Sequence, residues 1–324
     1  SVINNKLNDK NIYLMKDMDI LRINFVDYWP GHIKNNNYFY HLLSTKYNVI
    51  IDEKDPDLLF FSVDFGNVRE RDKYLNHRCK KIFYTGESVS ANFDSDRSIQ
   101  ARNHPANYSI GKCDYAFTFD FSKDERHYRL PLWVLYIDWF DKKSYGDPQF
   151  ILKPELIDSN DFISYEKNKF CAMVFSNPTK ERVDTYNLFS TYKKVDGFGH
   201  PFGNRTNGEM DKYNNLKNYK FSVCYENRLY AGYYTEKLFH AKTAGNIPIY
   251  YCDDKVSSDF NKKCFINLND YESLDDLFEY IKKVDQDDDL YKSYLREPLF
   301  EKGLIKKEFL PNSILEFITN TILK

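Results

Sequence analysis

The sequence predicts an α/β protein built from two Rossmann-like units that face a cleft. Short, strongly apolar segments such as DLLFFSV at 57–63 and FCAMVFS at 170–176 alternate with stretches of helical periodicity. Strands buried on both faces have this continuous apolar composition, and alternation with helices favours parallel sheets covered by helices. With 324 residues, the chain is long enough for two units, each with its own core.

The first half begins with a predicted strand, DILRINFV, which is followed by a helix, a strand and then DLLFFSV. KKIFYT at 80–85 and DYAFTFDF at 114–121 are further short apolar runs. Residues 142–166 are rich in Pro, Asp, Lys and Ser and have no clear period, so they are the predicted linker. We therefore expect a first domain at 1–150 and a second at 151–324.

The second half repeats the alternation from Lys169 onward. Strands are predicted at 170–176, 193–198, 221–226, 247–251 and 264–268, and helices at 181–190, 235–244 and 272–284. The last segment, NSILEFITNTILK, has an amphipathic pattern. We expect it to form a helix that packs back on the first domain.

Composition excludes several functional classes. The net charge of −2 and the lack of a basic tail give no reason to expect nucleic acid as a partner. No stretch approaches the roughly 20 apolar residues that span a bilayer, so we expect at most peripheral membrane association. The six cysteines have no paired spacing and lie mostly in apolar runs, which favours reduced, buried thiols in a cytoplasmic protein.

The segment FSVCYENRLYAGYYTEKLFHAKTAGNIPIYY at 221–251 carries most of the functional information. It predicts a strand that delivers Glu226 and Asn227 to a loop, a helix capped by Thr235, and a second strand. Ligands of such units bind at the carboxyl ends of the strands and at the helix N-terminus. Lys237 would oppose the helix dipole in the first turn, which suggests that an anion binds there.

This segment resembles the nucleotide-binding motif of the α1,3/α1,4-fucosyltransferases, glycosyltransferase family 10, especially the bacterial members. Three other strings match the same family in the same order: YTGES at 84–88 with Asn92 and Phe93, RLPLW at 129–133, and FSNPTKERVDTY at 175–186. The resemblance implies a GT-B fold, with the acceptor in the first domain and the donor in the second. It implies inverting transfer of L-fucose from GDP-β-L-fucose to an N-acetylglucosamine-containing oligosaccharide, of the LacNAc type, in an α1,3 linkage.

The resemblance also assigns the donor residues. Arg182, which follows the turn at 176–178 that contains Ser176, is expected to fork onto phosphate oxygens together with Lys237. Glu236 is expected to bind the ribose diol and to help stabilise charge on the fucosyl ring. Asn227 and Tyr233 match donor-contacting positions, although core packing is an equal alternative for Tyr233, and we favour a structural role for Glu226.

The general base implied by the resemblance is Glu87, at the carboxyl end of a predicted strand. The family usually has Pro before the Asn-Phe pair, whereas this chain has Ala91, which leaves the geometry of that loop open. Trp29 matches a tryptophan-bearing loop after the first strand and is a candidate sugar-stacking platform; a buried tryptophan that caps the sheet is the alternative.

We expect no obligatory metal, with Mn²⁺ or Mg²⁺ at most stimulatory. The DSD string at 94–96 resembles a metal-binding DxD but does not lie near the inferred diphosphate pocket, and the acidic run at 287–289 is typical of a solvated helix start. Two rival functions remain open at this stage: transfer of another GDP-deoxyhexose, and a non-catalytic glycan- or nucleotide-binding protein on the same scaffold.

Overall fold

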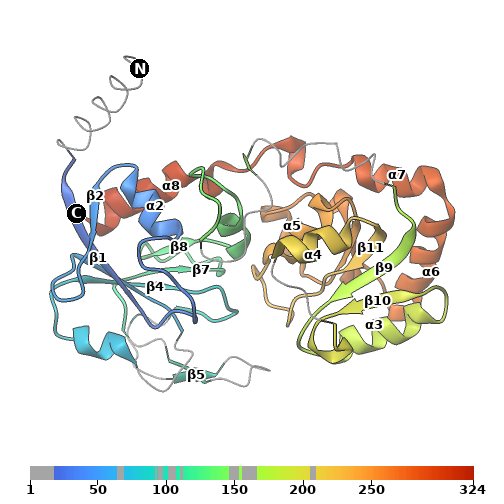
Figure 1. Ribbon diagram of the computed structural model, residues 1–324, viewed down its shortest axis with the longest axis horizontal. Helices are drawn as coiled ribbons and strands as arrows, with labels where there is room; N and C mark the ends of the chain where they lie inside the picture. Colours follow the sequence, from blue (N-terminus) through green and yellow to red (C-terminus); the bar gives the residue numbers. More distant parts are fainter. Residues whose placement is uncertain are drawn as a thin grey trace, which may run out of the picture.

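The structure is a computed structural model that describes residues 18–63, 69–91, 93, 98–100, 107–109, 112–145, 153–154, 166–204 and 209–324. Two parallel sheets lie side by side in this part of the chain, one from each half of the sequence (Figure 1). The predicted α/β class with parallel sheets is therefore confirmed.

In the described residues the first sheet has six parallel strands in the order β2-β1-β3-β4-β7-β8. Its elements are β1 (Ile20–Val26), α2 (Tyr38–Ser44), β2 (Asn48–Ile51), β3 (Leu58–Phe61), β4 (Lys80–Tyr84), β7 (Tyr115–Thr118) and β8 (His127–Arg129). A short antiparallel pair, β5 (Ser98–Gln100) and β6 (Asn107–Ser109), lies outside the sheet. The apolar runs predicted as strands form its centre, because β3 and the end of β4 are buried on both faces.

The second sheet has five parallel strands in the described residues, in the order β10-β9-β11-β12-β13. Its elements are β9 (Lys169–Val174), α3 (Lys180–Ser190), β10 (Val195–Phe198), α4 (Glu209–Leu216), β11 (Tyr219–Val223), α5 (Glu236–Thr243), β12 (Ile247–Tyr250), β13 (Ile266–Asn267), α6 (Leu274–Gln286) and α7 (Asp288–Arg296). Asp287 caps α7 by accepting a hydrogen bond from the Leu290 amide, so the acidic run is the predicted helix start.

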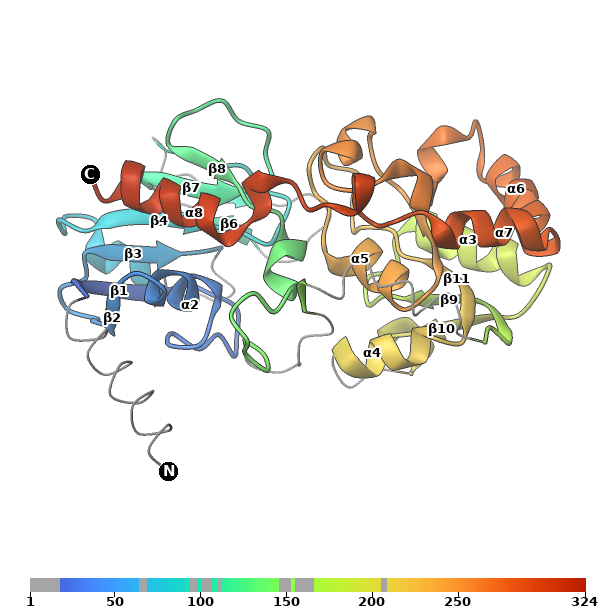
Figure 2. The same ribbon diagram turned by 90° about the horizontal axis from the view of Figure 1, so that it is seen from above.

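The C-terminal segment returns to the first sheet, as expected. After α7 the chain crosses the molecule, and α8 (Pro311–Phe317) lies beside α2 (Figure 2). The Phe317 ring lies 5.6 Å from the Phe117 ring and 5.2 Å from the Tyr128 ring, and Ile314 and Ile318 are fully buried. This apolar face fastens the end of the second half to the first sheet.

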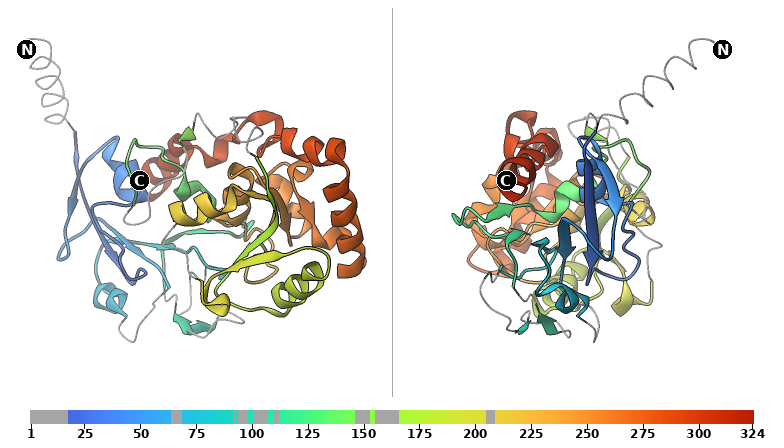
Figure 3. Two further views of the ribbon diagram at one scale, coloured as in Figure 1. Left: turned by 45° about the vertical axis from the view of Figure 1, so that its right-hand side comes forward. Right: turned by 90° about the vertical axis from the view of Figure 1, so that its left-hand side faces the viewer.

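The apolar core of the first sheet continues into the second half. One buried cluster contains Leu21 and Phe60 from the first sheet, Trp133 from the 3₁₀ turn at 132–136, and Leu238 and Phe239 from α5. A second cluster packs around the other sheet. The two halves are therefore joined by apolar packing as well as by the chain. Figure 3 shows the arrangement of the elements from two further directions.

The helix α5 differs from its prediction. We expected an amphipathic helix, but every residue from Glu236 to Thr243 except Lys237 is buried, because α5 lies between the second sheet and the turn at 132–136. Even Lys242 is buried, and its Nζ donates hydrogen bonds to the carbonyls of Tyr294 and Leu295 at the end of α7. Carbonyls in the last turn of a helix point away from it, and a cation there is favoured by the helix dipole.

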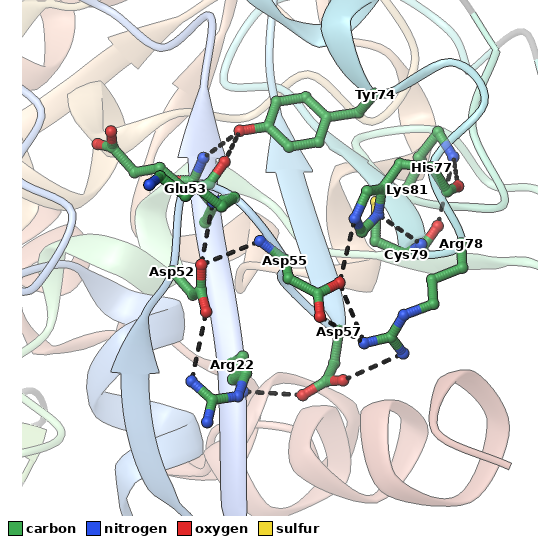
Figure 4. A network of polar contacts seen from close by, with 12 residues as sticks. Arg22, Asp52, Glu53, Asp55, Asp57, Tyr74, His77, Arg78, Cys79 and Lys81 are labelled. Carbon is green, nitrogen blue, oxygen red and sulfur yellow. Dashed lines mark hydrogen bonds and ion pairs between the residues drawn. The ribbon is translucent and has the colours of Figure 1, made fainter.

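A polar network holds the connection from β2 to β3, which contains no helix (Figure 4). Asp52 accepts hydrogen bonds from the amides of Lys54 and Asp55, both at 3.0 Å, and Asp57 accepts one from the Arg22 amide at 2.9 Å. Tyr74 donates to the Glu53 carbonyl at 2.5 Å. Asp57 precedes β3, so the network lies toward the amino ends of the central strands, and we interpret it as structural.

Candidate active site

Polar side chains gather at the carboxyl ends of strands from both sheets. Glu87 lies three residues beyond β4, Asn177 lies three residues beyond β9, and Glu226 lies three residues beyond β11. In open parallel sheets this is the edge where ligands bind. The segment 227–235, which we name the donor loop, connects this edge to the N-terminus of α5.

Hydrogen bonds hold the backbone of Glu87, but none holds its carboxylate in the described part of the chain. The Glu87 amide donates to Thr85 Oγ1 at 2.9 Å, and its carbonyl accepts from the Val89 amide at 2.9 Å. The carboxylate accepts no hydrogen bond from any described residue. Burial raises the pKa of Glu87, the charge of Lys237 lowers it, and Glu236 and Glu226 raise it further. Glu87 of the first half is thus within electrostatic reach of the charged groups of the second.

Glu226 is the polar centre of the second half. Its carboxylate accepts hydrogen bonds from the Thr235 amide at 3.1 Å, the Thr235 hydroxyl at 2.7 Å and the Tyr250 hydroxyl at 2.7 Å. Lys237 Nζ lies 3.3 Å from the same carboxylate, which is only 2% exposed. These contacts fit the structural role we favoured: Glu226 ties the donor loop and α5 to β12.

Lys237 lies in the first turn of α5, as expected. Thr235 caps this helix by accepting the Lys237 amide. Burial lowers the pKa of Lys237, but the carboxylates of Glu226 and Glu236 outweigh burial, so the pKa is raised overall. Lys237 is therefore a charged cation, bonded to Glu226, whose charge also acts on Glu87, and Glu236, the first residue of α5, is buried next to it in the chain.

Arg182 lies deeper than the sequence indicated, with only 2% of the residue exposed. Its Nη1 donates to the Asn177 carbonyl at 2.9 Å and to Asn227 Oδ1 at 3.0 Å, and its Nη2 donates to the Tyr225 carbonyl at 2.5 Å. A guanidinium has five N–H donors. The Nε–H and the second hydrogen of Nη2 form no hydrogen bond with the described residues.

Tyr233 lies where the two halves meet. The residue is 4% exposed, and its ring packs edge-on against Phe119 with the centroids 4.9 Å apart. Burial raises the pKa of its hydroxyl, as do the charges of Glu226, Glu87 and Glu236. The ring therefore has the packing role that we left open, while the hydroxyl lies among the charged groups.

A pocket of about 560 Å³ opens beside this cluster, within the usual range for small-molecule sites. Asn227 and Glu226 line it, and Arg182 is bonded to Asn227. Lys237 is bonded to Glu226, and Ser176 is exposed on the turn after β9. The remaining lining residues are Asn177, Thr179, Lys180, Glu181, Tyr225, Arg228, Leu229 and Tyr251.

A smaller pocket of about 340 Å³ shares Glu181 and Tyr251 with the first one and extends along Leu268 and Tyr271. Another hollow, of about 490 Å³, lies at the amino ends of β4 and β7 and contains Lys80 and Lys112. It is at the opposite edge of the first sheet, so the adjoining pair at the carboxyl ends is the better candidate site.

Trp29 is 38% exposed, which contradicts a buried tryptophan that caps the sheet. Its ring lies 5.3 Å from His32, 5.2 Å from Tyr28 and 6.5 Å from Tyr84, the residue that ends β4. Burial lowers the pKa of His32 to about 4, so this ring is neutral at pH 7. The result is an uncharged aromatic surface on the same strand ends as Glu87.

Two models of one protein family match the chain. "Glycosyltransferase family 10 (fucosyltransferase) C-term" matches residues 164–297, and "Alpha-(1,3)-fucosyltransferase FucT N-terminal domain" matches residues 23–136. This chain belongs to glycosyltransferase family 10. Its two parallel sheets are of the GT-B type found in that family.

Known proteins agree with this family-10 assignment. The alpha-(1,3)-fucosyltransferase FucT of Helicobacter pylori is 28% identical over 307 residues, covering 86% of this chain and 60% of that protein. A putative fucosyltransferase of Acanthamoeba polyphaga mimivirus is 35% identical over 146 residues, covering 41% of this chain and 24% of that protein. The family-10 chain therefore spans less than two thirds of the length of either relative.

The structural relatives cover the chain more fully. A crystal structure of an alpha1,3-fucosyltransferase superposes with a TM-score of 0.71 and 25% identity, covering 95% of this chain and 92% of that one. A crystal structure of an alpha1,3-fucosyltransferase with GDP superposes with a TM-score of 0.69 at the same identity and coverage.

Sequence reasoning missed two groups of residues in this family-10 chain. Arg228 lines the pocket but lies on an irregular loop with no periodicity to mark it. Tyr230 and Arg129 hold the donor loop against the first half; RLPLW was matched to the family, but nothing in its pattern indicated that Arg129 reaches the second half.

The structure describes only part of the chain, so its findings on metal sites and membrane helices apply to the described residues alone. Among the described residues, no group of three or more His, Cys, Asp or Glu side chains could hold a metal ion. The DSD string at 94–96 and Asn92 lie outside those residues, as does most of the predicted linker. In the described part of the chain, no helix is long and apolar enough to cross a membrane.

Proposed function

We propose that this protein is a GDP-fucose-dependent α1,3-fucosyltransferase. It would transfer L-fucose with inversion from GDP-β-L-fucose to a hydroxyl of an N-acetylglucosamine-containing oligosaccharide of the LacNAc type. The observation that carries the proposal is that the loop of Glu87, from the first sheet, is hydrogen-bonded through Ser90 to Tyr230 of the donor loop, which leads to Glu236 and Lys237 beside a pocket of nucleotide size. We assign acceptor binding to residues 1–150 and donor binding to residues 151–324.

The donor site would hold GDP through the second half. Lys237 and Arg182 supply positive charge to the diphosphate, and the exposed Ser176 hydroxyl lies on the turn between β9 and α3. The α5 N-terminus adds its partial positive charge. Asn227 lines the pocket, and Glu236 would accept hydrogen bonds from the ribose hydroxyls. The adjoining pocket with Tyr251 and Tyr271 offers aromatic walls for the guanine base.

The chemical step would be a single displacement. The Glu87 carboxylate takes the proton of the acceptor hydroxyl, whose oxygen forms a bond to C1 of fucose. The bond between C1 and the β-phosphate oxygen breaks, and its electron pair leaves with GDP. Attack from the face opposite GDP turns a β-linked donor into an α-linked product. Lys237 and Arg182 stabilise the negative charge that grows on the leaving phosphate.

The acceptor side of the proposal rests on the surface around Trp29. An exposed indole next to neutral rings is suited to stacking on the apolar face of a sugar, and it lies near the strand end that presents Glu87. A LacNAc-type acceptor bound here would extend from the cleft over the first half.

The test is a transfer assay with purified protein, a panel of GDP-sugars and LacNAc-type acceptors, read out as GDP release and by linkage analysis of the product. We expect turnover with GDP-fucose and an α1,3-linked product. Turnover with a different GDP-deoxyhexose instead would support the rival transferase. Tight GDP binding without turnover on any glycan would support a non-catalytic binding protein.

A further inference from the structure

The donor loop is attached to the first half of the protein at three places. Tyr230 forms hydrogen bonds with two residues of the first half, the carbonyl of Gly232 accepts a hydrogen bond from Arg129, and the Tyr233 ring packs on Phe119. None of these contacts comes from the cluster around Glu226, which holds the loop within its own half. The donor loop therefore bridges the two halves next to the site.

The Tyr230 hydroxyl makes the bridge closest to Glu87. It donates to Asp120 Oδ1 at 2.5 Å, in the loop after β7. Because a phenol has one hydrogen, the Ser90 hydroxyl must be the donor in the second contact, at 2.8 Å. Ser90 lies three residues after Glu87, in the loop that follows β4. The Arg228 guanidinium, which lines the pocket, lies 5.5 Å from the centre of the same ring.

Arg129 gives this bridge a rigid base. Its guanidinium is bonded to both oxygens of Asp259, at 2.6 and 3.2 Å, to the Phe119 carbonyl at 2.8 Å and to the Gly232 carbonyl at 2.7 Å. Trp133 Nε1 donates to the same carboxylate, which is fully buried. Gly232 has a φ of +91°, and a Cβ there would lie 2.3 Å from the Phe119 carbonyl oxygen. The backbone of the donor loop at Gly232 is thus in direct contact with the backbone of the first half at Phe119.

We propose that Tyr230 is a positioning residue for the transfer reaction, which fixes the Glu87 loop relative to the donor loop through Ser90 and Asp120. The inference rests on the proposed function, and it names the contacts that align the base with the donor. Glu87 and Lys237 belong to different sheets, so their separation depends on contacts between the halves. Reaction rates fall steeply when reacting groups are displaced by as little as about 1 Å. The Tyr230 bridge lies three residues from Glu87 in one half and seven from Lys237 in the other.

The test is Tyr230→Phe, which removes only the hydroxyl. The two hydrogen-bond partners of that hydroxyl, Ser90 and Asp120, are fully or partly exposed, so water can replace the lost hydrogen bonds. We expect kcat to fall by about 10-fold or more, with KM for GDP-fucose within about twofold. In a Glu87→Gln background, the same change should lower kcat by less than about twofold, because that variant has no general base whose position could matter. Tyr280→Phe is the matched control: its hydroxyl contacts Tyr294 between α6 and α7, and we expect wild-type kinetics.

A second readout needs no substrate. In the apo protein, amides of residues 85–90 and 227–235 should exchange hydrogen faster in Tyr230→Phe than in wild type or in Tyr280→Phe. Any one of three results would overturn the proposal. These are an unchanged kcat in Tyr230→Phe, an equal loss of kcat in the wild-type and Glu87→Gln backgrounds, or unchanged hydrogen exchange in both segments. A wild-type protein that does not transfer fucose would instead remove the proposed function, and the exchange experiment would still decide whether Tyr230 holds the two loops together.

Discussion

The proposed role of Glu87 is tested by Glu87→Gln. The glutamine keeps the size of the side chain and removes its ability to accept a proton. The backbone contacts of this residue, to Thr85 Oγ1 and from the Val89 amide, do not involve the carboxylate, and the carboxylate has no hydrogen-bond donor among the described residues. The substitution should therefore leave folding intact and affect the reaction alone.

The expected loss follows from the chemistry of a positioned base. General-base catalysis contributes roughly 10²–10⁴-fold in rate, which is about 2.7–5.4 kcal/mol at 1.36 kcal/mol per factor of ten. GDP affinity should change by less than about twofold, because the GDP contacts lie in the second half. Turnover and calorimetric GDP binding, measured for wild type and Glu87→Gln, give both numbers.

The pH dependence supplies an independent check. Burial raises the pKa of Glu87 above its ordinary value. Only the deprotonated carboxylate can act as the base, so activity should rise with pH through this raised pKa, and the rise should be lost in Glu87→Gln. If the variant keeps more than about a tenth of wild-type turnover, or keeps the same pH profile, the base is another carboxylate of the cleft.

Further predictions concern the cations, the metal and the acceptor surface. Lys237→Ala should lower kcat/KM and GDP affinity strongly, and it should also lower Tm because the buried Glu226 carboxylate loses its cation; unchanged GDP binding would contradict the assignment. Arg182→Ala should lower both activity and Tm, since it leaves the buried Tyr225 carbonyl without its donor at about 1–3 kcal/mol, and a normal melting curve would argue against this. Activity should survive excess EDTA; complete, Mn²⁺-reversible loss would show that a metal is required. Trp29→Ala should raise KM for the acceptor while GDP affinity stays unchanged, which a glycan titration would show.

Local signals in the sequence were sufficient for most of the fold. Continuous apolar runs such as DLLFFSV became buried parallel strands because their composition suits a strand covered on both faces. Thr235 became a helix cap because its side chain satisfies an amide that has no partner inside the helix. The same local reasoning placed Glu87 and Glu226 beyond strand ends, where parallel sheets expose side chains to ligands.

Two of the differences from prediction involve contacts between residues distant in the chain. The amphipathic pattern of α5 was misleading because the helix is covered on its second face by the turn at 132–136, more than 100 residues earlier. Arg182 carried no sign that it would be buried against the Tyr225 carbonyl, 43 residues later in the chain.

By itself, the sequence determined the strands, the helix caps and the positions of Glu87 and Lys237 in their own loops, because those depend on neighbouring residues. Only the tertiary structure decided that the two loops face each other. Arg129 reaches Asp259 across 130 residues, and Tyr230 reaches Ser90 across 140. No local pattern can encode such pairs, because the energy of each contact exists only after both halves have folded and packed.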